Sequence, residues 1–218
     1  MAFAFRGPLY PIANAGGRHS AVDLVAAAVG AGIRVVQLRV KSGSTRSFVE
    51  LARAAKTITD RNRALLIIDD RTDIARLIDA AGVHLGTEDL PAAAARVILG
   101  PTKIIGLSTH SPAQLAAAER EGYGDYLAYG PIFPTYTKER PDPVQGLDGL
   151  RAARQLTKRP LVAIGGVNAT NVEAVLKTGV DAVAIISAFA DADDPAAAVQ
   201  TLHQKALAAT VHRSPSRS

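Results

Sequence analysis

The sequence predicts a single-domain α/β protein of the (β/α)8 class, the TIM barrel. Eight short apolar segments alternate with segments whose apolar residues recur at helical spacing. This alternation is typical of parallel strands joined by helices, and eight strands favour a closed barrel. The competing fold is an open doubly wound sheet, which the lack of a GxGxxG motif after the first strand disfavours. With 218 residues, 48% of them hydrophobic, the chain is long enough for one core, at about 27 residues per strand–helix unit.

The expected strands are short apolar runs, mostly bounded by Gly, Pro or Asp. In chain order they span 8–13, 33–39, 64–69, 82–85, 103–108, 125–129, 160–164 and 181–186. The helices are expected at 21–31, 45–60, 73–80, an alanine-rich stretch after 89, a segment opening at 111–112, 147–157, 168 or 170 to 177, and 194–209. Ser20 is suited to cap the first helix and Pro112 to open the fifth. The barrel domain is expected over 1–209, and a disordered Ser-, Arg- and Pro-rich tail over 210–218.

The composition excludes several classes of function. The chain has no Cys, which rules out disulfides, thiolate catalysis and a Cys-type zinc site and fits a reducing cytoplasm. No signal peptide and no apolar run near the ~18 residues of a membrane span are seen. The net charge is 25 − 20 = +5, but the basic residues are scattered and aromatic residues make up only 5%, which argues against nucleic-acid binding. The expected partners are therefore small phosphorylated molecules, and the oligomeric state, a homo-oligomer included, stays open.

Polar side chains mark the end of the second strand. Gln37, Arg39 and Lys41 stand at every second position, so their side chains point to one face. Unpaired cations are costly on a buried face, and ligands of such barrels bind at the carboxyl ends of the strands. An anionic ligand is therefore expected there.

Two carboxylates follow the next two strands. Asp70 and Asp89 stand at adjacent strand ends, and paired oxygen ligands without Cys favour Mg2+ over Zn2+. Their expected neighbours Arg39, Lys41 and Lys138 point to a metal-bound polyphosphate. The alternative is that the acids simply pair with these cations.

A second anion site is expected after the last two strands. Gly165-Gly166 and Ile186-Ser187 stand where barrels of this class often bind phosphate through backbone N–H groups. The alternative for the two glycines is a tight turn. The long loop 130–146, with Thr135, Thr137 and Lys138, has the length of a functional lid.

Two histidines stand near the expected strand ends. His84 lies within the fourth strand and is expected to be a core or supporting residue rather than a base. His110 follows the fifth strand close to the expected site, without an assigned role.

Taken together, seven blocks of the sequence resemble the thiamine-phosphate synthase family, in family order over about residues 8–190. They are Gln37–Lys41, Asp69–Arg71, Gly82–Asp89, Gly106–His110, Gly130–Lys138, Ile164–Val167 and Ile186–Ala188. The resemblance implies a transferase that joins 4-amino-5-hydroxymethyl-2-methylpyrimidine pyrophosphate to 4-methyl-5-(2-phosphoethyl)thiazole, giving thiamine phosphate and pyrophosphate. It implies a Mg2+-assisted dissociative substitution that needs no protein nucleophile.

The resemblance also implies roles for individual residues. Asp70 and Asp89 would hold Mg2+. The pyrimidine pyrophosphate would be bound by Gln37, Leu38, Arg39, Val40, Lys41, Asp69, Ser108 and Lys138. The thiazole phosphate would be bound by Thr135, Tyr136, Thr137, Gly166, Ile186 and Ser187. The catalytic set would be Arg39, Lys41, Ser108 and Lys138.

One position departs from the family pattern. Asp69 stands where the family usually has Asn, and an ionised Asp donates no hydrogen bond. Three readings stay open: Asp69 is protonated, it accepts from the pyrimidine amino group, or it weakens substrate binding. Two other functions also stay open, a thiazole tautomerase and a non-catalytic barrel that binds thiazole or thiamine phosphate.

Overall fold

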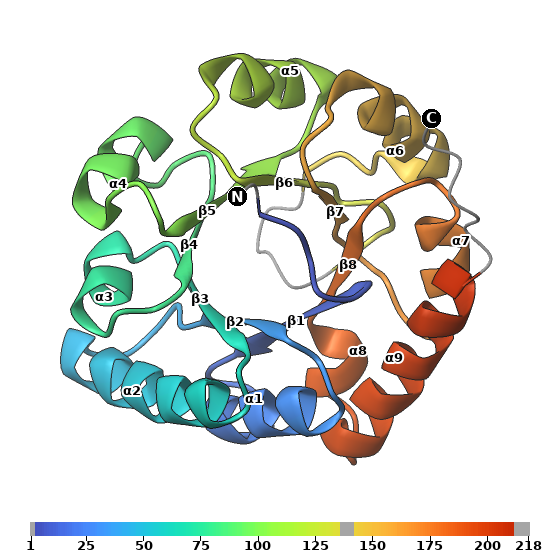
Figure 1. Ribbon diagram of the computed structural model, residues 1–218. Helices are drawn as coiled ribbons and strands as arrows, with labels where there is room; N and C mark the ends of the chain where they lie inside the picture. Colours follow the sequence, from blue (N-terminus) through green and yellow to red (C-terminus); the bar gives the residue numbers. More distant parts are fainter. Residues whose placement is uncertain (1–2, 136–141, 212–218) are drawn as a thin grey trace.

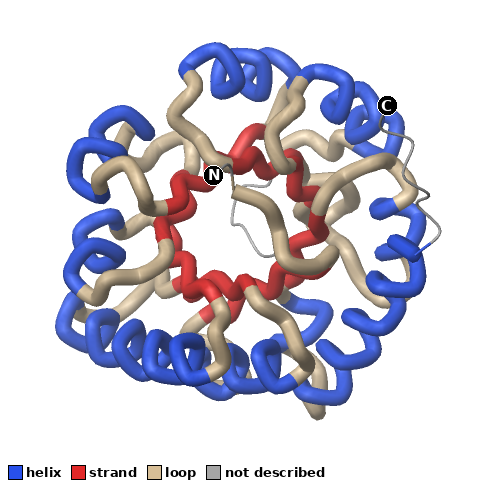
Figure 2. Tube along the Cα trace, in the orientation of Figure 1, coloured by secondary structure: helices blue, strands red, loops and turns tan. Residues whose placement is uncertain are grey.

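The structure, a computed structural model, describes residues 3–135 and 142–211. Eight parallel strands close into a barrel in sequence order, and the helices form a ring around it (Figures 1 and 2). The strands are β1 (Leu9–Asn14), β2 (Val35–Arg39), β3 (Leu65–Asp69), β4 (Gly82–Leu85), β5 (Ile104–Thr109), β6 (Tyr126–Tyr129), β7 (Leu161–Ala163) and β8 (Ala182–Ile185). The predicted (β/α)8 barrel is confirmed.

The helices follow the strands in the expected alternation. They are α1 (Ala21–Gly30), α2 (Thr45–Arg61), α3 (Thr72–Leu77), α4 (Ala92–Leu99), α5 (Pro112–Glu121), α6 (Gly146–Leu156), α7 (Val172–Leu176), α8 (Ser187–Ala190) and α9 (Pro195–Val211). As predicted, Ser20 Oγ caps α1 and Pro112 opens α5. No helix within 3–135 or 142–211 is both long and apolar enough to cross a membrane.

Most helix boundaries lie within one or two residues of the prediction, but α3 ends at Leu77 rather than at residue 80, and the last three helices differ in ways that the structure explains. The helix expected from 168 or 170 begins at Val172, because the Asn168 side chain accepts from the Thr170 N–H and forms a turn before it. The one-turn helix α8 follows β8 directly and was not expected. The last helix runs through Val211, two residues beyond the expected end at 209, and the rest of the expected tail, 212–218, lies outside the described residues.

The core has two layers, one between strands and helices and one inside the barrel. The inner layer includes Tyr10 and Tyr126, which are at most 1% exposed. The segment before β1 runs across one end of the barrel (Figure 1), and Phe5 packs on both tyrosine rings at centroid distances of 5.3 and 5.2 Å. Because this segment leads into the start of β1, it covers the amino end of the barrel. The carboxyl end is thus left as the mouth.

Candidate active site

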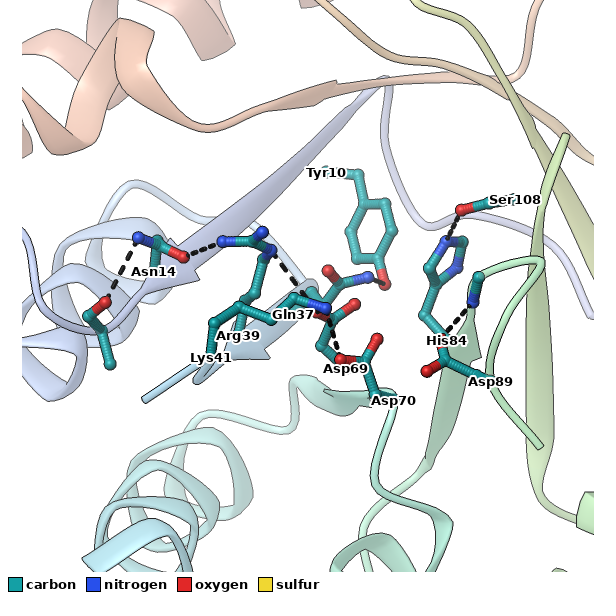
Figure 3. Close-up of polar contacts among 12 residues, drawn as sticks. Tyr10, Asn14, Gln37, Arg39, Lys41, Asp69, Asp70, His84, Asp89 and Ser108 are labelled. Atoms are coloured by element: carbon teal, nitrogen blue, oxygen red, sulfur yellow. Dashed lines mark hydrogen bonds and ion pairs between the residues drawn. The ribbon is translucent and has the colours of Figure 1, made fainter. Parts of the chain in front are cut away.

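A cluster of cations and carboxylates lies at the carboxyl ends of β2 and β3 (Figure 3). The Lys41 ammonium is ion-paired with the Asp70 carboxylate, and its Nζ lies 3.3 Å from Asp69 Oδ2. Arg39 Nε lies 3.5 Å from the same Asp69 oxygen. The convergence expected from the alternation at the end of the second strand is therefore present, although Lys41 stands two residues beyond the end of β2.

Asp69 is the most buried acid of this cluster, with its side chain 9% exposed. Burial, reinforced by the Asp70 charge, raises the pKa of Asp69 to about 7, although Lys41 and Arg39 oppose the shift. Burial tends to lower the pKa of Lys41, but the Asp69 and Asp70 carboxylates outweigh it and hold that pKa above its ordinary value. Asp69 is therefore an acid that is readily protonated near neutral pH.

Asp70 and Asp89 approach each other from adjacent strands. Asp70 has a φ of +59°, rare for a residue with a side chain, and its N–H donates to the His84 carbonyl oxygen at 2.8 Å. Asp89 Oδ2 accepts from the Gly86 N–H at 2.7 Å. Burial raises the pKa of Asp89, and the nearby Asp70 carboxylate raises it further. These backbone contacts thus hold the Asp70 and Asp89 carboxylates close together at the carboxyl ends of β3 and β4.

The Asp70 and Asp89 carboxylates are oxygen donors of the kind that suits Mg2+. Mg2+ is commonly held by one or two carboxylates together with substrate phosphate oxygens. Within the described part of the chain, no three His, Asp or Glu side chains gather into a metal site. Asp70 and Asp89 therefore suit a shared ion rather than an all-protein cage.

A buried chain of hydrogen bonds crosses the barrel interior. Gln37 Nε2 donates to Tyr10 Oη at 3.1 Å, and Tyr10 Oη lies 2.9 Å from Tyr126 Oη. His84 Nδ1 lies 2.9 Å from Tyr126 Oη, and its Nε2 lies 2.9 Å from Ser108 Oγ. The sequence placed His84 in a core or supporting role, and these contacts confirm that prediction.

The second expected anion site lies across the mouth. A cavity of about 480 Å3 is lined by residues that include Asn14, Thr135, Gly166, Ile186 and Ser187. Gly166 has a φ of +67°, and a Cβ there would stand 2.6 Å from the Pro134 carbonyl oxygen. The Gly-Gly pair therefore makes the tight turn that the sequence left as an alternative, and the turn forms one wall of the cavity.

The remaining predicted residues are Leu38, Val40 and three residues of the long loop. The Leu38 side chain is fully buried between the barrel and the helices. Val40 lines a smaller cavity of about 220 Å3 with Lys41 and Asp70. The residues Tyr136, Thr137 and Lys138 lie outside the described residues.

Sequence reasoning missed three residues that shape the mouth. Asn14, the last residue of β1, accepts from the Arg39 guanidinium through Oδ1 and lines the larger cavity. Tyr10 and Tyr126 support the polar groups from within the barrel. The signal for Asn14 was its place at a strand end, but the expected strand stopped at residue 13. The tyrosines carry no such signal, because they lie inside apolar strands.

The fold and the site define a single-domain (β/α)8 barrel with two groups of polar residues at its carboxyl-end mouth. The family model for thiamine monophosphate synthase matches residues 9–189. The chain is 44% identical to the thiamine-phosphate synthase of Chloroflexus aurantiacus over 89% of this chain and 90% of that protein. It is 45% identical to the Clostridium botulinum thiamine-phosphate synthase over 78% of this chain and 83% of that protein.

A solved structure gives the same result. The thiamine phosphate pyrophosphorylase from Pyrococcus furiosus superposes with a TM-score of 0.85 at 39% identity, covering 93% of this chain and 96% of that one. The chain therefore belongs to the thiamine-phosphate synthase family, whose members are transferases of thiamine biosynthesis. The predicted family is confirmed.

Proposed function

We propose that this chain couples 4-amino-5-hydroxymethyl-2-methylpyrimidine pyrophosphate to 4-methyl-5-(2-phosphoethyl)thiazole. The observation that carries the proposal is the placement of Arg39 beside Asp69, and of Lys41 beside Asp69, Asp70 and Asp89. A diphosphate with a divalent cation matches this mixture of charges. The cavity beside Gly166 and Ser187 offers a separate place for the monophosphate of the second substrate.

In this proposal, Asp70 and Asp89 are the residues that would hold Mg2+. When bound, Mg2+ neutralises charge on the diphosphate and makes it a better leaving group. Lys41 is paired with Asp70 at the mouth, which supports a role for its ammonium in binding the diphosphate. Asp70 would then be a ligand of the ion, and the Lys41 ammonium would contact a phosphate oxygen.

The residues of the chain act by binding and by electrostatics. The bond between the pyrimidine methylene carbon and the diphosphate oxygen breaks, and its electron pair leaves with the diphosphate. Arg39 and Lys41 stabilise that growing negative charge, and Lys138, in the loop outside the described residues, has the same assigned role. The thiazole nitrogen then donates its lone pair to the methylene carbon and forms the new C–N bond. No protein nucleophile takes part.

The remaining residues position the two substrates. Gln37, Asp69 and Ser108 face the pyrimidine half, with Leu38 of β2 and Val40 directly after it as the backbone neighbours of Arg39. Thr135, Gly166, Ile186 and Ser187 hold the thiazole phosphate, together with Tyr136 and Thr137 of the loop. The absence of Cys supports a site of action in the cytoplasm.

The direct test is to mix the purified chain with both phosphorylated substrates and Mg2+ and to measure thiamine phosphate by chromatography. Product is expected with Mg2+ and is expected to fall to background with excess EDTA. Thiazole phosphate alone should raise the melting temperature. Stabilisation by thiazole phosphate without any product would instead favour a tautomerase or a non-catalytic binding protein, neither of which needs the paired carboxylates.

A further inference from the structure

The hydrogen-bonded chain inside the barrel connects two predicted substrate-binding residues. It begins at Gln37, passes through Tyr10, Tyr126 and His84, and ends at Ser108, with each step between 2.9 and 3.1 Å. Its middle members are almost completely buried: Tyr10 is 1%, Tyr126 0% and His84 7% exposed. Figure 3 shows Gln37 beside Tyr10, and His84 turned toward Ser108. Gln37 is equally buried at 1% exposed, whereas Ser108 at the other end is partly exposed.

Such a chain has a direction, because each phenol has a single proton to donate. The Nε2 group of Gln37 has hydrogens and no lone pair to accept with, so Tyr10 Oη is an acceptor at this end. Among the described residues, Tyr126 is the other hydrogen-bond partner of Tyr10 Oη. The Tyr10 proton must therefore go to Tyr126, since a buried phenol proton without an acceptor is costly.

The same rule carries the direction to the far end. Once Tyr126 Oη accepts from Tyr10, its own proton goes to His84 Nδ1. The neutral imidazole then carries its hydrogen on Nε2, which donates to Ser108 Oγ. Because Ser108 Oγ accepts a hydrogen bond from His84 Nε2, its own O–H is directed away from His84 and toward the mouth.

We propose that Tyr126 and His84 are positioning residues that fix the Ser108 hydroxyl as a hydrogen-bond donor to the bound substrate. The group that receives this bond is an acceptor atom, either a pyrimidine ring nitrogen or a diphosphate oxygen. The identity of that substrate rests on the proposed function. The direction of hydrogen-bond donation from Gln37 to Ser108 does not. The opposite direction would make Ser108 an acceptor and would require Gln37 to present its carbonyl oxygen to Tyr10.

The proton order is read directly from the histidine tautomer. The protein is labelled with 15N-histidine, and the His84 resonances are assigned by comparison with His84→Gln. At pH 8, without substrate, the expected spectrum is that of the Nε2–H tautomer. A spectrum of the Nδ1–H tautomer, or of a ring carrying both protons, overturns the proposal. This measurement needs no catalytic activity.

A double-mutant cycle tests whether the Tyr126 hydroxyl affects substrate binding and turnover through Ser108. Tyr126→Phe removes one hydroxyl and keeps the ring, and kcat/KM for the pyrimidine pyrophosphate is expected to fall roughly 3- to 10-fold, the worth of one hydrogen bond. In the Ser108→Ala background the same change is expected to cost less than about 2-fold. Equal losses in both backgrounds overturn the positioning role.

The matched control is Tyr129→Phe. It removes a phenol that donates to Gln145 Oε1 at 2.8 Å and takes no part in the hydrogen bonds between Gln37 and Ser108. It is expected to leave the His84 tautomer unchanged, whereas Tyr126→Phe is expected to give a mixture of tautomers. If the wild-type protein makes no thiamine phosphate, the proposed function fails, and the His84 spectrum still decides the proton order. If Tyr126→Phe does not fold, the wild-type spectrum decides it as well.

Discussion

The Lys41 ammonium is ion-paired with the Asp70 carboxylate, so this contact joins a predicted diphosphate ligand to a predicted metal ligand. Lys41 is about half exposed and Asp70 less so, which leaves both groups open to exchange partners. In solvent-accessible positions such pairs contribute little to stability, at most about 1 kcal/mol. The Lys41–Asp70 pair therefore adds little to the stability of the fold, and a role in binding a charged ligand explains it better.

The first prediction concerns the two carboxylates. Asp70→Asn and Asp89→Asn should each lower Mg2+-dependent turnover by at least about 100-fold, because each removes one of the two charged groups proposed to bind the metal. The melting temperature should change little or rise, since both acids lie beside another carboxylate. Initial rates measured against Mg2+ concentration check this.

The control for this prediction is Asp60→Asn, which breaks an exposed ion pair with Lys56 on α2, away from the mouth. Its turnover should match that of the wild type. Full activity in either mouth variant would refute the metal assignment.

The regular parts of the fold were predictable because their signals are local. Apolar strands and amphipathic helices alternate along the chain, and their closure into a barrel follows from the number of strands. The short helix α8 and the start of α7 were not predictable in this way. The start of α7 depends on the Asn168 side chain making its own turn, which competes with the helix for the same N–H groups.

The charged residues of the mouth were also predictable, because they follow strand ends. Arg39, Asp69 and Asp70 lie where the topology places them. Their supports were not predictable. Tyr126 looks like an ordinary apolar strand residue until the closed barrel brings it to Tyr10, which is 116 positions away in the sequence. Contacts of this range follow from the tertiary structure alone.

The second prediction is a pH dependence of stability caused by Asp69. Its pKa is raised from 3.8 to about 7 in the folded protein, so the folded state binds the proton more tightly than the unfolded state. The stabilisation from protonated Asp69 is complete below about pH 4 and is lost as the pH rises to about 7. The loss is on the order of 2–4 kcal/mol in the free energy of unfolding.

Asp69→Asn should remove this dependence, because the amide does not titrate. Urea unfolding of both proteins between pH 4 and 8, with EDTA and without substrate, should show a flatter profile for the variant. Parallel profiles for the two proteins would show that Asp69 titrates near its ordinary pKa in the folded state.

The third prediction concerns the space for Tyr126. A Cβ at Gly106 would stand 2.0 Å from Tyr126 Cζ and 2.3 Å from its Oη, inside a closed barrel with no room to move. Gly106→Ala should therefore lower the free energy of unfolding by about 1–3 kcal/mol and also reduce kcat/KM, since the ring supports the residues behind the mouth. Urea unfolding and steady-state rates check both effects.

The control for Gly106→Ala is Gly30→Ala at the end of α1, where a Cβ meets nothing within 4 Å. This variant should be at least as stable as the wild type, because alanine favours helix. A Gly106→Ala protein with unchanged stability would mean that the Tyr126 ring is free to shift.

The fourth prediction separates the two substrate sites through Gly166. Its φ of +67° disfavours any residue with a side chain, and a Cβ there would stand 2.6 Å from the Pro134 carbonyl oxygen and 2.7 Å from Phe133 Cβ. Gly166→Ala should therefore displace the wall of the larger cavity and raise KM for the thiazole phosphate by about 10-fold or more, the effect of losing roughly one charge-assisted hydrogen bond. KM for the pyrimidine pyrophosphate should stay within about 2-fold of the wild-type value, because most of its proposed ligands lie in or directly after β2 and β3, in the loop after β4 and in β5. Steady-state kinetics with each substrate varied in turn measures both constants.

An equal rise in the two KM values would mean that the variant disturbs the whole mouth. An unchanged KM for the thiazole phosphate would mean that Gly166 is not part of the thiazole-phosphate site.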